Sequence, residues 1–223
     1  YVRLVERRAV DELGAAGAPG EVARGFAIGA ALFAVTVGML LLFNVATVER
    51  GDGWRALAAG LGAAVAAALV EETLLRAIFF RLVEASLGSW IALGASAALF
   101  GLLHAFNPGA TVVSTVAIAL EAGIVLAAAF LFTRRLWMAI GLHAAWNFTE
   151  GGVFGASVSG HAAPGLLHSS FHGAPLVSGG AFGPEASIVA VLVCLIVGVA
   201  LLVRAHARGS FRPPFWRRPR SGR

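Results

Sequence analysis

The sequence predicts an all-α membrane protein, a polytopic bundle of about six transmembrane helices. Of its 223 residues, 58% are hydrophobic and 13% are charged, whereas soluble domains contain about 45–50% apolar and about 25% charged residues. The mean hydropathy is +0.82. Apolar runs of membrane-spanning length recur along the chain, and arginines gather on alternate connections between them. This composition excludes a soluble globular enzyme and a disordered chain.

Six apolar runs account for these helices. About 20 apolar residues, rising about 1.5 Å each, cross the hydrocarbon core of a bilayer. The first run has this length and lacks the small-residue cleavage site that follows a signal peptide. The turn signal Asn107-Pro108-Gly109 ends the third run. The predicted spans are residues 26–48, 54–82, 90–106, 111–132, 136–148 and 186–203.

The distribution of arginine predicts which side of the membrane each connection faces. All 17 basic residues are arginines. With the N-terminus inside, Arg50 and Arg55 fall outside, Arg76 falls within the membrane, and all the others are cytoplasmic. The positive-inside rule therefore predicts a multi-pass protein of the cell membrane with both termini cytoplasmic. The cytoplasmic arginines are Arg3, Arg7, Arg8, Arg24, Arg81, Arg134, Arg135, Arg204, Arg208, Arg212, Arg217, Arg218, Arg220 and Arg223.

This topology divides the chain into three regions. The sequence pI of about 11.1 comes from arginines beside apolar spans, so we expect the C-terminal tail to bind anionic lipid head groups and no nucleic acid. A solvated, disordered tail is the alternative. The single cysteine, Cys194, excludes a disulfide framework and a Cys-rich zinc site. The regions are a cytoplasmic N-terminal segment (1–25), a helical domain (26–204) with its motifs in 65–150 and a Gly/Ser/His/Pro-rich outer loop at 150–185, and a basic tail (205–223).

Three ionisable side chains interrupt the second run, where each costs about 2.5–3.5 kcal/mol on membrane-insertion scales. Glu72 and Arg76 are four residues apart with the acid first, which is the favourable order for a helical ion pair. Glu71 points about 100° away around the helix and cannot share that arginine equally. We therefore expect Arg76 to hold Glu72 ionised, and Glu71 to remain free to accept a proton. The alternative is an ion-pair cluster that only clamps helices together.

Two further runs carry polar residues at helical spacing. Phe100 and His104 share one helix face of the third run, and His143 and Asn147 share one face of the fifth. A lone histidine in an apolar helix is usually a packing residue, but two histidines, an asparagine and a glutamate pair indicate a site. Such a site can hydrolyse a carbonyl compound. The glutamate would take a proton from water with the help of His104, and His143 and Asn147 would donate hydrogen bonds to the oxyanion.

Several other polar residues have no assigned role. Glu121 lies in the middle of the fourth run, where it either faces the same site or hydrogen-bonds to a neighbouring helix. Gly25-x-x-x-Gly29 is a small-residue packing motif that is common in membrane helices. Three outer-loop histidines have an irregular spacing that does not favour a metal site: His161, His168 and His172.

Taken in order, Glu71-Glu72-x-x-x-Arg76, Phe100-x-x-x-His104 and His143-x-x-x-Asn147 resemble the three motifs of the CAAX protease and bacteriocin-processing family of intramembrane endopeptidases. The stretches LWMAIGLHAAWNFTEGGVFGASVSG and GGAFGPEAS resemble the extended signature of its bacterial members. The resemblance implies an all-helical membrane core, peptide-bond hydrolysis within the bilayer, and catalysis centred on the first glutamate and the two histidines. Ala77 departs from the glycine that is common at that position in the family. Its methyl group should reduce the space between packed helices without removing a catalytic group.

The sequence therefore predicts an intramembrane endopeptidase acting on membrane-embedded or membrane-associated peptides and proteins. A non-hydrolytic immunity or scaffold protein of the same family is the main alternative, and a small proton-coupled transporter is another. The resemblance allows two kinds of catalysis. In the first, a zinc ion would be held by Glu71, His104 and His143. The second, which we favour, uses no cofactor and needs only the glutamates, histidines and asparagine described above. The predicted catalytic residues are Glu71, Glu72, Arg76, His104, His143 and Asn147.

Overall fold

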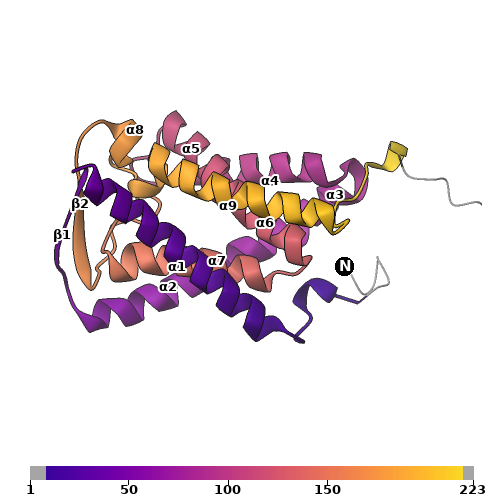
Figure 1. The fold of residues 1–223 in the computed structure, drawn as a ribbon, viewed down its shortest axis with the longest axis horizontal. Coiled ribbons are helices and arrows are strands. Elements are labelled where there is room, and N and C mark those ends of the chain that lie inside the picture. Colours follow the sequence, from indigo (N-terminus) through magenta and orange to yellow (C-terminus); the bar gives the residue numbers. More distant parts are fainter. Residues whose placement is uncertain (1–8, 218–223) are drawn as a thin grey trace, which may run out of the picture.

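In the computed structural model, which describes residues 9–217, the chain folds into a bundle of helices with a two-stranded sheet at one end (Figure 1). Three π-helical segments continue the helices: Thr73–Phe80 joins α2 to α3, Ala119–Gly123 joins α5 to α6, and Phe148–Val153 extends α7. The predicted all-α membrane bundle is confirmed. The helices are α1 (Ala18–Leu42), α2 (Trp54–Glu72), α3 (Arg81–Leu87), α4 (Ser89–His104), α5 (Val112–Ile118), α6 (Ile124–Thr133), α7 (Trp137–Asn147), α8 (Pro175–Ser178) and α9 (Ile188–Ala207), and the strands are β1 (Ala46–Arg50) and β2 (Leu167–Phe171).

Among the described residues, three helices are long and apolar enough to cross a membrane by length and composition. They are Ala18–Leu42, Val112–Thr133 and Ile188–Ala207, and Ser89–His104 is a shorter apolar helix. Helix α2 with its continuation and helix α7 complete the set of helices that correspond to the six predicted spans. The crossing of the membrane by α2, α4 and α7 stays a prediction.

The first span was predicted at residues 26–48, and its end was wrong. Helix α1 starts after Gly17, which is left-handed with φ 77°, and it has a proline in its first turn, as is common where helices begin. Asn44 has φ 55° and turns the chain out of the helix. The β-branched Thr47 and Val48 then lie in strand β1.

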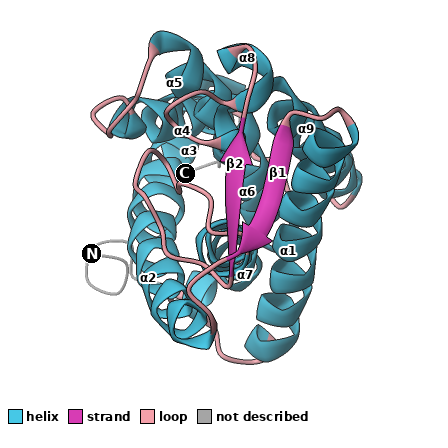
Figure 2. Ribbon diagram, turned by 90° about the vertical axis from the view of Figure 1, so that its left-hand side faces the viewer, coloured by secondary structure: helices cyan, strands magenta, loops and turns pink. Residues whose placement is uncertain are grey.

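The region predicted as the outer loop, residues 150–185, supplies the partner of β1. Strand β2 pairs with β1 in antiparallel register, from Ala46 opposite Phe171 to Arg50 opposite Leu167. Figure 2 shows the sheet lying across one end of the helices. The short helix α8 and the last part of the π-helical extension of α7 also fall within residues 150–185. The pairing therefore ties the outer loop to the end of α1.

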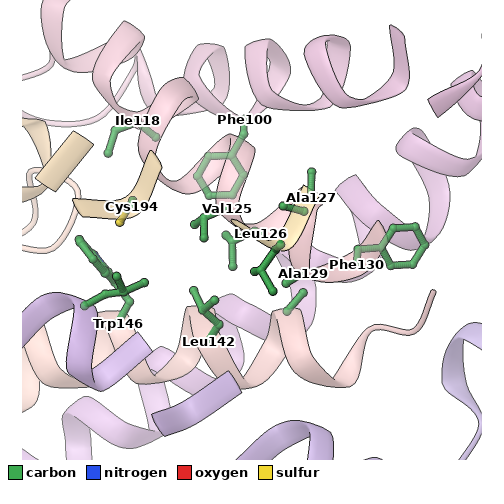
Figure 3. Close-up of a cluster of buried hydrophobic side chains, with 14 of the residues drawn as sticks. Phe100, Ile118, Val125, Leu126, Ala127, Ala129, Phe130, Leu142, Trp146 and Cys194 are labelled. Atoms are coloured by element: carbon green, nitrogen blue, oxygen red, sulfur yellow. The ribbon is translucent and has the colours of Figure 1, made fainter. Parts of the chain in front are cut away.

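Helix α6 is the centre of the bundle. Every residue from 125 to 131 is buried, as expected for a helix that is apolar on all sides. Phe100 of α4, Leu142 and Trp146 of α7, and Cys194 of α9 belong to the same core (Figure 3). Two of the motif-bearing helices, α4 and α7, are thereby fixed against one scaffold.

Helices α1 and α7 approach closely through glycines. A Cβ atom added at Gly25 or Gly29 would overlap backbone atoms of α7, and one added at Gly141 would overlap the backbone of α1. Small residues allow this backbone contact in membrane helices. The Gly25-x-x-x-Gly29 motif therefore packs within the chain, against the helix that carries His143.

Arginines hold together the end of the bundle opposite the sheet, where both described ends of the chain lie (Figure 1). Their ion pairs link the N-terminal segment, α3 and the α6–α7 connection: Arg81 with Glu12 at 2.7 Å, Arg134 with Glu84 at 2.5 Å and Arg135 with Glu21 at 3.1 Å. Six arginines of the predicted cytoplasmic set lie outside the described residues: Arg3, Arg7, Arg8, Arg218, Arg220 and Arg223.

Thiol labelling tests the predicted orientation. Ala174, in the outer loop, and Ala207, at the end of α9, are both exposed. In intact cells an impermeant thiol reagent should label an Ala174→Cys variant, and should label an Ala207→Cys variant only after permeabilisation. The natural Cys194 is fully buried and should stay unlabelled in the unmodified protein, which serves as the control. The reverse labelling pattern would contradict the predicted topology.

Candidate active site

The two adjacent glutamates lie where α2 passes into a π-helical segment. Such segments are rare and often occur at functional sites. Arg76, within the segment, donates from Nη1 to Glu72 Oε1 at 3.0 Å and from Nη2 to the carbonyl oxygen of Gly123 at 3.2 Å. The side chains of Glu72 and Arg76 are completely buried. The expected ion pair is present, and the second hydrogen bond of Arg76 ties the π-helical segment Thr73–Phe80 to the segment Ala119–Gly123.

Glu72 has a second partner on another helix. His143 of α7 donates from Nδ1 to Glu72 Oε1 at 2.9 Å. His104 of α4 donates from Nδ1 to the carbonyl oxygen of Phe100 at 2.8 Å. These roles follow because a carboxylate and a carbonyl can only accept. With both Nδ1 protons engaged, Nε2 is the free nitrogen of each ring.

Both free nitrogens face the other glutamate. Glu71 Oε2 lies 4.0 Å from His104 Nε2 and 4.0 Å from His143 Nε2. These distances are too long for direct hydrogen bonds, but a water molecule could bridge any two of the three atoms. Within the described residues, Glu71 Oε2 has no hydrogen-bond partner. Glu71 therefore has no structural partner comparable to those of Glu72.

An aromatic ring supports both the arginine and one histidine. The guanidinium carbon of Arg76 lies 4.8 Å from the centre of the Phe100 ring, and the His104 ring stacks on Phe100 with centroids 4.7 Å apart and an interplanar angle of 20°. Phe100 is buried in the core. The motif phenylalanine thus fixes the orientation of His104 through both its ring and its carbonyl oxygen.

A cavity of about 600 Å³ opens beside this group. Glu71, His104 and Asn147 line it, whereas Glu72 and Arg76 do not. His143 lines a second, smaller cavity of about 20 Å³, which is large enough for one water molecule. The structure therefore brings all six predicted residues together, with three at the cavity wall and three behind it.

Ser159 of the outer loop was not identified from the sequence. It lines both cavities together with His104 and Asn147. Its φ of 48° is left-handed, which is uncommon for a residue other than glycine, and Asn107 Nδ2 donates to its carbonyl oxygen at 3.0 Å. The adjacent Ser159-Gly160 pair is a turn signal, but its contact with the site depends on the path of the loop.

Buried carboxyl groups lie behind the histidines. Glu121 and Glu185 line the small cavity, and Glu121, Glu150 and Glu185 are each exposed by no more than 2%. Glu121 therefore faces the small cavity, one of the two positions that the sequence allowed. Glu150 and Glu185 were not identified, although a glutamate beside Gly151-Gly152, just beyond an apolar run, was an available signal.

The donor atoms at the site suit a metal by their chemistry, because zinc binds imidazole nitrogens and carboxylate oxygens. A second hydrogen bond from the other ring nitrogen, present here for both histidines, is typical of zinc ligands. With the side chains as placed, however, no group of three or more His, Cys, Asp or Glu residues within 9–217 could hold a metal ion. Of the outer-loop histidines, His161 lines the large cavity, and His172 Nε2 lies 3.3 Å from Thr47 Oγ1.

One comparison with known proteins identifies a family. The family model described as Type II CAAX prenyl endopeptidase Rce1-like matches residues 53–149. No curated protein and no solved structure matches the chain. The matched range begins just before α2 and contains all six predicted site residues. Residues 53–149, which hold the site and make up less than half of the chain, are therefore similar to the Rce1-like type II CAAX prenyl endopeptidases, in agreement with the resemblance to CAAX proteases seen in the motifs.

Proposed function

We propose that the protein is an intramembrane endopeptidase that hydrolyses peptide bonds of membrane-associated proteins or peptides. The family of residues 53–149 supports a membrane endopeptidase in general. The observation that carries the finer proposal is the convergence of Glu71 Oε2 with His104 Nε2 and His143 Nε2 beside a cavity of about 600 Å³. A proton acceptor, two imidazoles and room for a peptide are what hydrolysis requires.

In the proposed reaction Glu71 acts as general base. It takes a proton from a water molecule that also bonds to His104 Nε2, and the resulting hydroxide attacks the carbonyl carbon of the scissile bond. The carbonyl oxygen becomes an oxyanion, which accepts hydrogen bonds from the Asn147 amide and from His143. Glu71 then passes its proton to the leaving nitrogen, and the C–N bond breaks to give a carboxylic acid and an amine.

Glu72 and Arg76 support this reaction from behind the cavity. The Glu72 carboxylate accepts a hydrogen bond from His143 Nδ1, which fixes the orientation of the ring and stabilises its charged form. In that form Nε2 carries a hydrogen that can be donated to the oxyanion. Arg76 balances the charge of Glu72 within the core. We therefore propose that both residues act as positioning groups for His143.

Mass spectrometry of cleavage products tests the function. Purified protein in detergent should cleave members of a membrane-peptide library at defined bonds, and a Glu71→Gln variant should not. Peptides that bind without being cleaved would favour the non-hydrolytic scaffold. If the protein neither binds nor cleaves any peptide of the library, that result would contradict a peptide-directed function.

The proposed route needs no cofactor, and elemental analysis tests that point. A zinc ion at this site would be held by Glu71, His104 and His143, and would supply a polarised water. We expect purified enzyme to contain substoichiometric zinc and to keep its activity after prolonged treatment with a strong chelator that reaches the site. Stoichiometric zinc, with activity lost on stripping and restored by zinc alone, would reassign the three residues from proton transfer to ligation.

The basic end of the chain has a separate proposed role in lipid binding. Arg204 lies in the last turn of α9 and Arg208 directly follows the helix, and both are exposed. The guanidinium carbon of Arg208 lies 4.0 Å from the centre of the Phe132 ring. Arginines beside a membrane helix attract anionic lipid head groups. We propose that this end and the tail bind the inner leaflet.

A further inference from the structure

The large cavity lies in one half of the bundle. On α2 its lining runs from Ala59 to Glu71, and no residue between Glu72 and Leu102 lines it. From α4 only Leu103 and His104 at the C-terminal end contribute. The remaining residues that line the cavity, apart from Asn147, follow the C-terminal ends of α4 and α7 in the chain. The cavity therefore leads from the glutamate toward the end of the bundle that carries the outer loop.

The cavity is long and has apolar walls. Ala59 and Glu71 are about 18 Å apart along the helix at about 1.5 Å per residue, which is room for about five residues of extended peptide. One face of α2 contributes only small side chains before Glu71, namely Ala59, Gly60, Ala63, Ala64 and Ala67. Ala59, Ala63 and Leu103, which line the cavity, are exposed to solvent, so the cavity is open along α2 and at the end of α4. An apolar segment could thus enter from the side as well as from the end.

The two ends of the bundle differ in charge. At the cavity end, the described connections and the start of α2 contain only two arginines, Arg50 and Arg55. The opposite end holds the arginine ion pairs that join the N-terminal segment, α3 and the α6–α7 connection. By the positive-inside rule the arginine-rich end is cytoplasmic. The cavity mouth then lies in the outer half of the membrane.

We propose that the substrate is an apolar peptide segment presented from the extracytoplasmic side of the membrane, which lies extended along α2 with its scissile bond at Glu71. This inference rests on the proposed function. It assigns to the enzyme membrane-inserted or exported peptides of the outer half of the bilayer. The wall formed by Ala59, Ala63 and Ala67 sets the width of the groove.

Vesicles of known orientation test the side of entry. The probe is a quenched fluorogenic peptide with a core of six Ala, Leu and Val residues between charged ends that prevent it from crossing the membrane. Cleavage should be observed in right-side-out vesicles and lost in inverted vesicles, and detergent should restore it in the latter. Cleavage only in inverted vesicles would overturn the inference while leaving the endopeptidase function intact.

Two sets of variants separate the inference from the function. A small charged methanethiosulfonate reagent should modify an Ala63→Cys variant in right-side-out but not in inverted vesicles, whether or not the protein cleaves the probe. The reverse pattern of modification would overturn the inference.

An Ala63→Phe variant should lose about tenfold or more in kcat/KM, because the peptide segment can no longer align with Glu71. The matched Ala58→Phe variant, on the exposed opposite face of α2, should cleave like the unmodified protein. Equal activity of the two phenylalanine variants would show that the groove does not bind substrate.

Discussion

A Glu71→Gln variant should lose peptide hydrolysis while remaining folded and able to bind substrate. The amide keeps the shape of the side chain but cannot take a proton from water, and a general base contributes about 10²–10⁴-fold to a rate. Stability should be little changed, because Glu71 has only 4.0 Å contacts to the two histidines and its side chain is 31% exposed. Cleavage kinetics, thermal unfolding and peptide binding on the same preparation check all three expectations.

An Asn107→Ala variant provides a control for this result, since Asn107 lines the same cavity and its side-chain amide donates to the Ser159 carbonyl oxygen and not to a glutamate or histidine of the site. It should retain the chemistry of hydrolysis and change mainly the affinity for the peptide. A Glu71→Gln variant that cleaves peptides at the normal rate would remove Glu71 from the proposed mechanism. One that fails to fold would instead favour a purely structural role for the pair of glutamates.

A Glu72→Gln variant should lose both stability and activity. Glu72 Oε1 accepts from Arg76 at 3.0 Å and from His143 at 2.9 Å, and its side chain is completely buried. Removal of its charge leaves the guanidinium of Arg76 uncompensated in the core, and broken buried pairs cost about 3–5 kcal/mol. Thermal unfolding of the two glutamine variants side by side measures the difference.

A double variant tests the reason for that loss. In Glu72→Gln/Arg76→Met the stranded charge is absent, so part of the lost stability should return. Activity should stay low, because His143 still lacks the carboxylate that orients its ring. Equal melting temperatures for the Glu71→Gln and Glu72→Gln variants would contradict the division of roles, and would identify the pair as a clamp between helices.

Local features of the chain were sufficient to predict much of the bundle. Apolar runs of span length predict membrane helices because burial of apolar surface in lipid does not depend on which helix is the neighbour. The pairing of Glu72 with Arg76 was predictable for a similar reason, since residues four apart meet on any α-helix. Turn residues such as Asn107-Pro108-Gly109 marked the end of α4 because their backbone preferences act locally.

The local geometry also set limits on these predictions. The π-helical segments that follow Glu72 and contain Glu121 have no sequence signal comparable to a cap or a turn. Strands β1 and β2 are five residues each, which is too short for a period-two pattern to be recognised, and β1 comes directly after the apolar run of the first helix. Residues 43–48 were therefore assigned to the first helix.

The sequence by itself determined a helical membrane bundle, the ion pair between Glu72 and Arg76, and the motif residues Glu71, His104 and His143. Only the tertiary structure decided that His143 bonds to Glu72, that Arg76 reaches Gly123, and that Ser159 and Glu185 line the small cavity behind the histidines. The physical reason is the separation of the partners along the chain. Contacts within one helical turn follow from a spacing of three or four residues, whereas contacts between distant segments depend on how whole helices pack, through features such as the glycine contacts of α1 with α7 and the burial of α6 on all sides.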